Sequence, residues 1–137
     1  MNHYRKTFHK YKSRQGSKSC PFCGQDTISS AIFENDLIYI APNLTQYDLW
    51  ELHDVENHLL IIPKRHVETL SELSSAERLA IMDQAAKYEA MGYSVYARGF
   101  GFVKRSVKHQ HTHLLKVTDK KPRFAIFIRS PYYLFKK

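Results

Sequence analysis

The sequence has no long apolar run, and this absence excludes several classes of protein. No stretch of its 137 residues approaches the 18 or so unbroken apolar residues of a transmembrane helix. The basic N-terminus is not followed by the apolar segment of a secretory signal. The length suits one domain with one core and is too short for two. We therefore expect a single cytoplasmic domain.

Cysteine is also scarce. The two cysteines, Cys20 and Cys23, lie in Cys-Pro-Phe-Cys-Gly, and two are too few for a secreted disulfide scaffold. The gap of two residues is also tight for a structural disulfide. In a cytosolic protein such a pair indicates either half of a zinc site or a redox motif. The spacing alone leaves both interpretations open.

Acidic residues are few, 13 against 21 Lys and Arg, so the formal net charge is +8. No acidic residue precedes Cys20, and residues 1–18 are polar and lack periodicity, so we expect a flexible basic tail there. Such a run is either a solvated tail or an electrostatic arm that binds nucleotides or nucleic acid. Its basic residues are Arg5, Lys6, Lys10, Lys12, Arg14 and Lys18.

The rest of the chain, residues 19–137, alternates short apolar segments with turn signals. A first hairpin is expected to pair Ala31–Glu34 with Leu37–Ala41. A second is expected to pair Trp50–His53 with His58–Pro63 around the turn residues Asp54–Asn57. Later strands are expected at Ser94–Arg98 and Lys108–Val117, followed by a C-terminal extension (about 118–137) whose two apolar runs form an edge strand or tail.

One long helix is expected after residue 74. Ser74 and Glu77 have the spacing of a capping box, in which each side chain bonds the backbone of the other residue. Gly92 marks the end of the helix. The apolar stripe on this helix (Leu79, Met82, Ala86 and Ala90) is interpreted as core packing. Short strands with one long helix predict an α+β fold, with an antiparallel sheet of about five or more strands.

Three histidines alternate with other residues in the strand expected over Lys108–Val117. In a β-strand alternate side chains share a face, so His109, His111 and His113 are expected on one face, about 6.5–7 Å apart. Three ionisable rings are costly to bury without a function. Either His109 and His111 bind one metal, as in some hydrolases, or one histidine is a nucleophile towards phosphorus whose neighbours orient the substrate.

Two segments together resemble the histidine triad (HIT) superfamily. They are His58-Leu-Leu-Ile-Ile-Pro-Lys-Arg-His66-Val and Ser106-Val-Lys-His109-Gln-His111-Thr-His113-Leu-Leu, which occur in the family's order with a helix between them. The upstream Cys-x-x-Cys matches the zinc-containing members. The resemblance spans roughly residues 20 to 117. It implies a HIT-like sheet and the activity of a nucleotide hydrolase or nucleotidyl transferase.

The resemblance assigns a role to each motif residue. It implies that His111 attacks the α-phosphorus of a nucleoside 5′-phosphate derivative and forms a nucleotidyl-histidine intermediate. Such derivatives include phosphoramidates, dinucleoside polyphosphates and adenylylated molecules. His113 would contact phosphate oxygens, and Ser106 would bond the phosphate or the leaving group. His58 would line the same site, and Asn43 would stand where a polar residue holds the ribose.

The resemblance also implies a structural zinc ion. Its ligands in zinc-containing members correspond to Cys20, Cys23, His66 and His109, which form a closed set of two sulfurs and two nitrogens. The zinc would tie the cysteine-containing segment (the knuckle, residues 20–23) to the catalytic segment. Family members are often two-fold dimers that join their sheets, so a homodimer is expected here.

The chain also departs from the family pattern. Arg98 and Arg105 stand approximately where members carry an Asn and a Gly-Gln pair. Each arginine is either a solvated surface residue or a charge-assisted contact to a more anionic substrate. The segment between Asn43 and His58 is long, and its Tyr47 and Trp50 are expected to pack in the core rather than stack on a base. The alternative functions are a nucleotide- or nucleic-acid-binding module with little turnover, or a deadenylase that acts on nucleic-acid ends.

Overall fold

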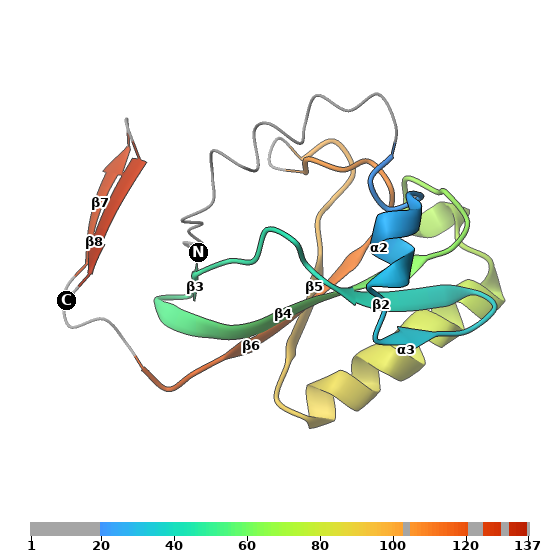
Figure 1. Ribbon diagram of the computed structural model, residues 1–137, viewed down its shortest axis with the longest axis horizontal. Coiled ribbons are helices and arrows are strands. Elements are labelled where there is room, and N and C mark those ends of the chain that lie inside the picture. Colours follow the sequence, from blue (N-terminus) through green and yellow to red (C-terminus); the bar gives the residue numbers. More distant parts are fainter. Residues whose placement is uncertain (1–19, 103–104, 121–124, 130–131, 137) are drawn as a thin grey trace.

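An antiparallel sheet of six strands forms the body of the described chain in the computed structural model (Figure 1). The structure describes residues 20–102, 105–120, 125–129 and 132–136, the last two ranges by their backbone only, so the tail expected over 1–18 lies outside it. The strand order is β1-β2-β4-β6-β5, and β3 pairs with β4. This architecture confirms the expected α+β fold. The sheet strands are β1 Phe33–Glu34, β2 Ile38–Pro42, β3 Leu49–Trp50, β4 His53–Pro63, β5 Ser94–Ala97 and β6 Thr112–Val117.

The pairing of β4 with β6 decides which side chains share a face of the sheet. Leu59 lies opposite Leu114, and Leu60 lies opposite His113. Because neighbouring side chains alternate, Leu59 and Leu114 point to one face, whereas Leu60 and His113 point to the other. The first face packs against the long helix α3 (Ser75–Ala90), since Ile81 and Ala85 of this helix share a core cluster with Leu114. The second face carries the catalytic candidates.

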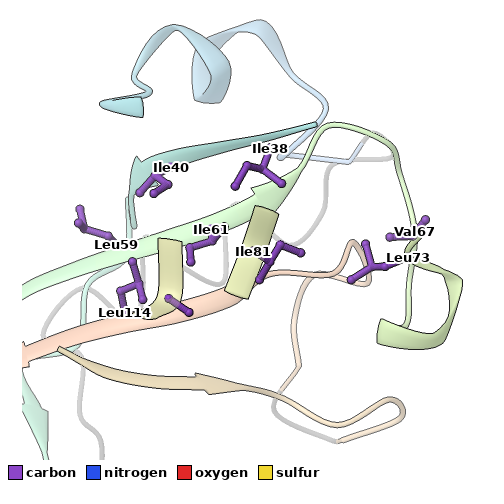
Figure 2. Packing of buried hydrophobic residues seen from close by; sticks show 9 residues of the cluster. Ile38, Ile40, Leu59, Ile61, Val67, Leu73, Ile81 and Leu114 are labelled. Carbon is purple, nitrogen blue, oxygen red and sulfur yellow. The ribbon is translucent and has the colours of Figure 1, made fainter. Parts of the chain in front are cut away.

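The buried side chains of the core between α3 and the sheet are aliphatic (Figure 2), and the partly buried rings of Phe33, Tyr88 and Tyr93 pack against them. Each fully buried Leu, Ile or Val side chain contributes about 1.5–3 kcal/mol to the stability of the fold, because its apolar surface is removed from water. A smaller cluster on the opposite face joins Tyr39, Ala41, Leu60 and Ile62 and lies next to the short helix α2 (Gln25–Ser29). The labelled residues of Figure 2 are Ile38, Ile40, Leu59, Ile61, Val67, Leu73, Ile81 and Leu114.

Helix α3 begins where the capping box predicts. The Ser74 hydroxyl oxygen accepts a hydrogen bond from the Glu77 amide at 3.2 Å, and the Glu77 carboxylate accepts one from the Ser74 amide at 2.7 Å. Gly92, with φ of +85°, follows the helix end in a conformation that glycine adopts at little cost. Both helix boundaries expected from the sequence are therefore confirmed.

The expectation that the apolar stripe of α3 packs in the core is wrong. Leu79 and Met82 are 62% and 65% exposed, and Ala86 and Ala90 are exposed as well. The helix has apolar residues on two sides, and helical spacing alone does not say which side is buried. The buried side was obscured because it includes a carboxylate, which is satisfied by the helix cap and by Arg65. The buried residues of α3 are Glu77, Ile81 and Ala85.

The second hairpin turns earlier than expected. Its connection is Glu51 and Leu52, whose φ angles are 50° and 66°, whereas the expected turn over Asp54–Asn57 is wrong. Asp54–Asn57 lie within β4, where the register shifts between Val55 and Asn57 as in a β-bulge. Asp and Asn are common in turns, but here they accompany a bulge.

The C-terminal extension contains a hairpin of its own. Strand β7 (Ala125–Arg129) pairs antiparallel with β8 (Tyr132–Lys136) as a second, two-stranded sheet (Figure 1). The 3-10 helix η1 (Leu70–Glu72) precedes α3. Across the described ranges, no helix combines the length and apolar character that crossing a bilayer requires.

Candidate active site and metal centre

Four potential metal ligands converge from three parts of the chain. Cys20 and Cys23 precede α2, His66 follows β4, and His109 precedes β6. Their ligand atoms all lie within 4.8 Å of one another. Sγ atoms of both cysteines lie 3.4 Å from Nδ1 of His109, and Sγ of Cys23 lies 3.3 Å from Nδ1 of His66. This cluster can hold a metal ion.

The donor set fits a tetrahedral metal. With bonds of about 2.3 Å to sulfur and about 2.0 Å to nitrogen, tetrahedral geometry separates the two donors by about 3.5 Å, close to the 3.3–3.4 Å found here. Nε2 of His109 lies 2.9 Å from the Pro63 carbonyl, which can only accept a hydrogen bond. Nε2 therefore carries the hydrogen, and Nδ1 presents its lone pair to the sulfurs.

His111 is buried and fixed in one tautomer. Its Nδ1 donates to the carbonyl of His109 at 2.7 Å, which leaves the lone pair of the neutral ring on Nε2. Burial is the main cause that lowers the pKa of His111 to about 4, and the charges of Arg105 and Arg98 lower it further. The ring is therefore neutral near pH 7, as a nucleophile requires.

The triad is only partly in a strand, so the strand expected over Lys108–Val117 is too long. Strand β6 begins at Thr112, and the amide of Gln110 bonds the carbonyl of Val67 at 2.7 Å instead of a neighbouring strand. The rings of His111 and His113 lie 4.9 Å apart between centroids, closer than regular alternation predicts. The irregular backbone lets the rings converge. All three triad histidines are buried.

His113 is held by His58 from β4. The Tyr47 amide donates to Nδ1 of His58 at 3.2 Å, so neutral His58 carries its hydrogen on Nε2. That Nε2 lies 2.9 Å from Nδ1 of His113 and donates to it. His113 in turn carries its hydrogen on Nε2. The side-chain nitrogen of Asn43 lies 3.1 Å from Nε2 of His58, which brings Asn43 into the same cluster.

An aromatic stack supports His113 from the edge strand. The Tyr96 ring is nearly parallel to the His113 ring, 4.4 Å away, and Trp50 stacks on Tyr96 at 4.8 Å. Tyr47 and Trp50 are buried against Leu115, so the expectation that they pack in the core is confirmed. Sequence reasoning missed Tyr96, because only the register of β5 against β6 places it opposite His113.

The two arginines occupy different environments. Arg98 lies over the rings of Tyr47 and Tyr96, 6.0 and 5.9 Å from their centroids, and bonds the Tyr47 hydroxyl. Arg105 donates to the carbonyls of Glu68 and Lys108 and to the side chain of Gln110. Ser106 is exposed in the same connection. Arg105 thus ties the triad segment to the segment after β4.

Phe22 is a site residue that the sequence analysis missed. It lies between the two cysteines, and its ring meets the His111 ring edge-on, 5.0 Å between centroids and at 71°. The same ring lies 6.0 Å from His109. The only sequence signal is its position within Cys-Pro-Phe-Cys. The knuckle therefore supplies two sulfurs to the cluster and a packing surface to His111.

Comparison with solved structures identifies the fold. The chain superposes on a HIT family hydrolase from Clostridium thermocellum with a TM-score of 0.55 and 20% identity, over 79% of this chain and 98% of that chain. The chain has the HIT fold. The chain also superposes on a HIT family hydrolase from Legionella pneumophila Philadelphia 1 with a TM-score of 0.52 and 19% identity, over 77% of this chain and 97% of that chain. A histidine triad nucleotide-binding protein from Candida albicans matches with a TM-score of 0.54 and 21% identity, over 75% and 78%.

The sequence alone finds no such match. No protein-family model matches it, and neither does any curated protein. The resemblance carried by two short motifs is thus supported by the backbone, because 79% of this chain superposes on a solved HIT structure. At about one identical residue in five, this likeness establishes the fold and leaves the chemistry to the residues of the site.

Proposed function

We propose that this chain is a HIT-type nucleotide hydrolase or nucleotidyl transferase, with His111 as its nucleophile. The observation that carries the proposal is the hydrogen bond from Nδ1 of His111 to the His109 carbonyl at 2.7 Å. It leaves the lone pair of His111 on Nε2, beside His113, before any substrate arrives. The substrates are nucleoside 5′-phosphate derivatives, such as phosphoramidates, dinucleoside polyphosphates or adenylylated molecules.

The reaction has two steps. Nε2 of His111 attacks the α-phosphorus, a P–N bond forms, and the bond to the leaving group breaks with its electron pair on that group. An amine leaving group takes up a proton from solvent as it departs. Water then attacks the same phosphorus, the P–N bond breaks, and its electron pair returns to Nε2 while water releases a proton to solvent. The product is a nucleoside monophosphate. An acceptor other than water would give nucleotidyl transfer.

The neighbouring residues fit supporting roles. His113 would contact phosphate oxygens through the hydrogen on its Nε2, because His58 holds its other ring nitrogen at 2.9 Å. Asn43, next to His58 at 3.1 Å, is proposed to hold the ribose. Contacts to phosphate or to the leaving group are proposed for Ser106, Arg98 and Arg105.

We propose zinc as the metal of the Cys20, Cys23, His66 and His109 cluster. Two thiolates and two imidazoles suit zinc better than oxygen-preferring cations. When bound, the ion would act as a structural tie between the knuckle and the triad segment. It would keep His109 in place, so that its carbonyl can hold His111.

The test compares His111→Ala with a control histidine. The full chain is mixed with adenosine 5′-phosphoramidate or a dinucleoside polyphosphate and quenched in alkali, since a P–N bond to histidine is labile in acid. Its intact mass is then measured. Wild type should gain the mass of one nucleotidyl group, and His111→Ala should neither gain it nor turn over. His53→Ala, which removes a ring bonded to the Thr118 carbonyl, should behave as wild type.

The outcome also separates the proposal from binding without turnover. A nucleotide- or nucleic-acid-binding module would bind the same compounds and release no product, and His111→Ala would bind as tightly as wild type. The net charge of +8 attracts polyanions and is the observation that favours this second function. If His111→Ala hydrolysed the compounds at the wild-type rate, the nucleophile assignment would be wrong.

We also propose that two copies pair through the exposed side of α3 and the open strand β5. Leu79 and Met82 are exposed on the helix, and Val95 is exposed on the neighbouring strand at the edge of the sheet. An edge strand can extend its sheet through a second copy, and an apolar stripe beside it would be covered by the same contact. Light scattering should show a dimer for wild type and a monomer for Met82→Glu. A monomeric wild type would contradict the pairing.

A further inference from the structure

The connection from β5 to β6 exposes two aromatic rings. Phe100 and Phe102 are 72% and 48% exposed. The Phe102 amide donates to the Gly99 carbonyl at 3.2 Å, and Gly101 has φ of +72°, so the backbone itself sets this turn. Neither ring belongs to the core clusters of the described chain. Exposed aromatic rings on a turn are typical of binding surfaces.

One of these rings, Phe102, is connected to the candidate active site through Arg98. Arg98 lies 5.6 Å from the Phe102 ring centroid and 5.9 Å from the Tyr96 ring centroid. Tyr96 stacks on His113 at 4.4 Å. A series of contacts therefore leads from His113 through Tyr96 and Arg98 to Phe102, which lies on the same turn as Phe100. A long ligand with one end at His113 would reach them.

The sequence of this connection carries positive charges and no negative ones, which favours a polyanion as its ligand. No acidic residue occurs between Glu89 and Asp119, a range that includes the whole connection and the triad. Five basic residues occur in the same range. Cations that contact phosphates, together with aromatic rings that stack on bases, are the two elements by which proteins bind single-stranded nucleic acid. Of the five, Arg98, Arg105 and Lys108 belong to the described part of the connection, whereas Lys116 lies on β6 over the Tyr93 ring.

We propose that Arg98, Phe100 and Phe102 form a stacking surface for unpaired bases of single-stranded nucleic acid. The bases would stack on the two rings, and Arg98 would contact the intervening phosphate. The bound strand would also present a nucleotide to His111, and this second part of the inference rests on the proposed function. Binding itself does not, so the two ideas can fail separately.

The test measures binding without turnover. Anisotropy of a fluorescent oligothymidylate, and of oligouridylate in a parallel arm, is titrated with the full chain carrying His111→Ala. Replacing Phe100 and Phe102 by Ala should weaken binding about 30-fold or more, since each of the two stacked bases contributes about 1–3 kcal/mol. Replacing both rings by Tyr should restore it. The matched control replaces two exposed leucines elsewhere, Leu44 and Leu70, and should change binding less than about 2-fold.

Three results would overturn the surface. The double alanine variant could bind as well as the leucine control, the parent could fail to bind either oligonucleotide, or anionic lipid vesicles could bind through the same two rings in place of the strand. If the wild-type chain does not hydrolyse the nucleotide compounds but the His111→Ala chain binds the strand through the two rings, only the proposed function is contradicted. If the wild-type chain hydrolyses these compounds but replacement of Phe100 and Phe102 does not weaken strand binding, only this surface is contradicted.

Discussion

The paired side chains of Arg65 and Glu77 provide a sharp test of the packing argument. Glu77 exposes only 5% of its side chain, whereas Arg65 exposes 53%. The carboxylate accepts two hydrogen bonds from this guanidinium, at 2.7 and 3.1 Å, and one from the Ser74 amide at 2.7 Å. We expect Glu77→Gln to destabilise the fold, because the amide cannot reproduce these charge-assisted bonds.

The pKa of Glu77 gives the magnitude. The hydrogen bond from Arg65 is the main cause that lowers this pKa from 4.5 to about 2, and the Ser74 bonds lower it further against the effect of burial. A tenfold change in proton affinity corresponds to about 1.4 kcal/mol, so the full difference would be about 3 kcal/mol. Water screens the half-exposed arginine, so we expect about 2 kcal/mol.

The sign follows from the direction of the shift. A carboxyl group with a lowered pKa in the folded state stabilises the protein above its unfolded pKa, near 4.5. That stability should therefore be complete at pH 6 and should decline as the pH falls from about 4.5 towards 2. Glu77→Gln should remove this part of the pH dependence.

Urea denaturation, followed by fluorescence of the single tryptophan, measures the effect. Trp50 is buried, so its emission reports unfolding. The matched control is Glu34→Gln, which breaks an ion pair with Lys64 whose side chains are 49% and 35% exposed. It should cost less than about 1 kcal/mol. Equal losses for the two variants, or an unchanged acid dependence in Glu77→Gln, would refute the reasoning.

Three further predictions concern the fold and the metal. Replacing Glu51 by Asn and Leu52 by Gly should stabilise the protein by about 1 kcal/mol in the same assay, because both positions have positive φ; a loss would contradict the turn. Ile61→Ala should cost about 2–5 kcal/mol, while Leu79→Ala should cost less than about 0.5 kcal/mol when both are measured in the monomeric Met82→Glu background, so equal costs would show that Leu79 packs in the core. A zinc chelator should lower the melting temperature, and added zinc should restore it. Unchanged melting would argue against the metal.

Local signals in the sequence predicted the elements that depend on neighbouring residues. The capping box of Ser74 and Glu77 located the start of α3, because its hydrogen bonds span only three residues. The order of two short motifs indicated the HIT fold, which superposition supports. The four ligands of the cluster were expected from the resemblance to zinc-containing members of the HIT superfamily, and their ligand atoms lie together in the structure.

Features that depend on tertiary packing were not accessible in this way. The exposed stripe of Leu79 and Met82 looked like a core because helical periodicity does not identify the buried side. The turn at Glu51 and Leu52 uses residues that turn statistics disfavour, so only the backbone reveals it. Tyr96 required the register of β5 against β6.

The alternation of β6 separates the two tasks of the molecule within a single strand. Leu114 faces the aliphatic core, and His113 and Leu115 face the site. Deletion of one residue here would exchange the faces, so that a histidine would enter the aliphatic layer and an aliphatic side chain would enter the site. Gene variants with such a deletion should lose fold and chemistry together, whereas substitutions on the helix side can alter stability and leave the histidines in place.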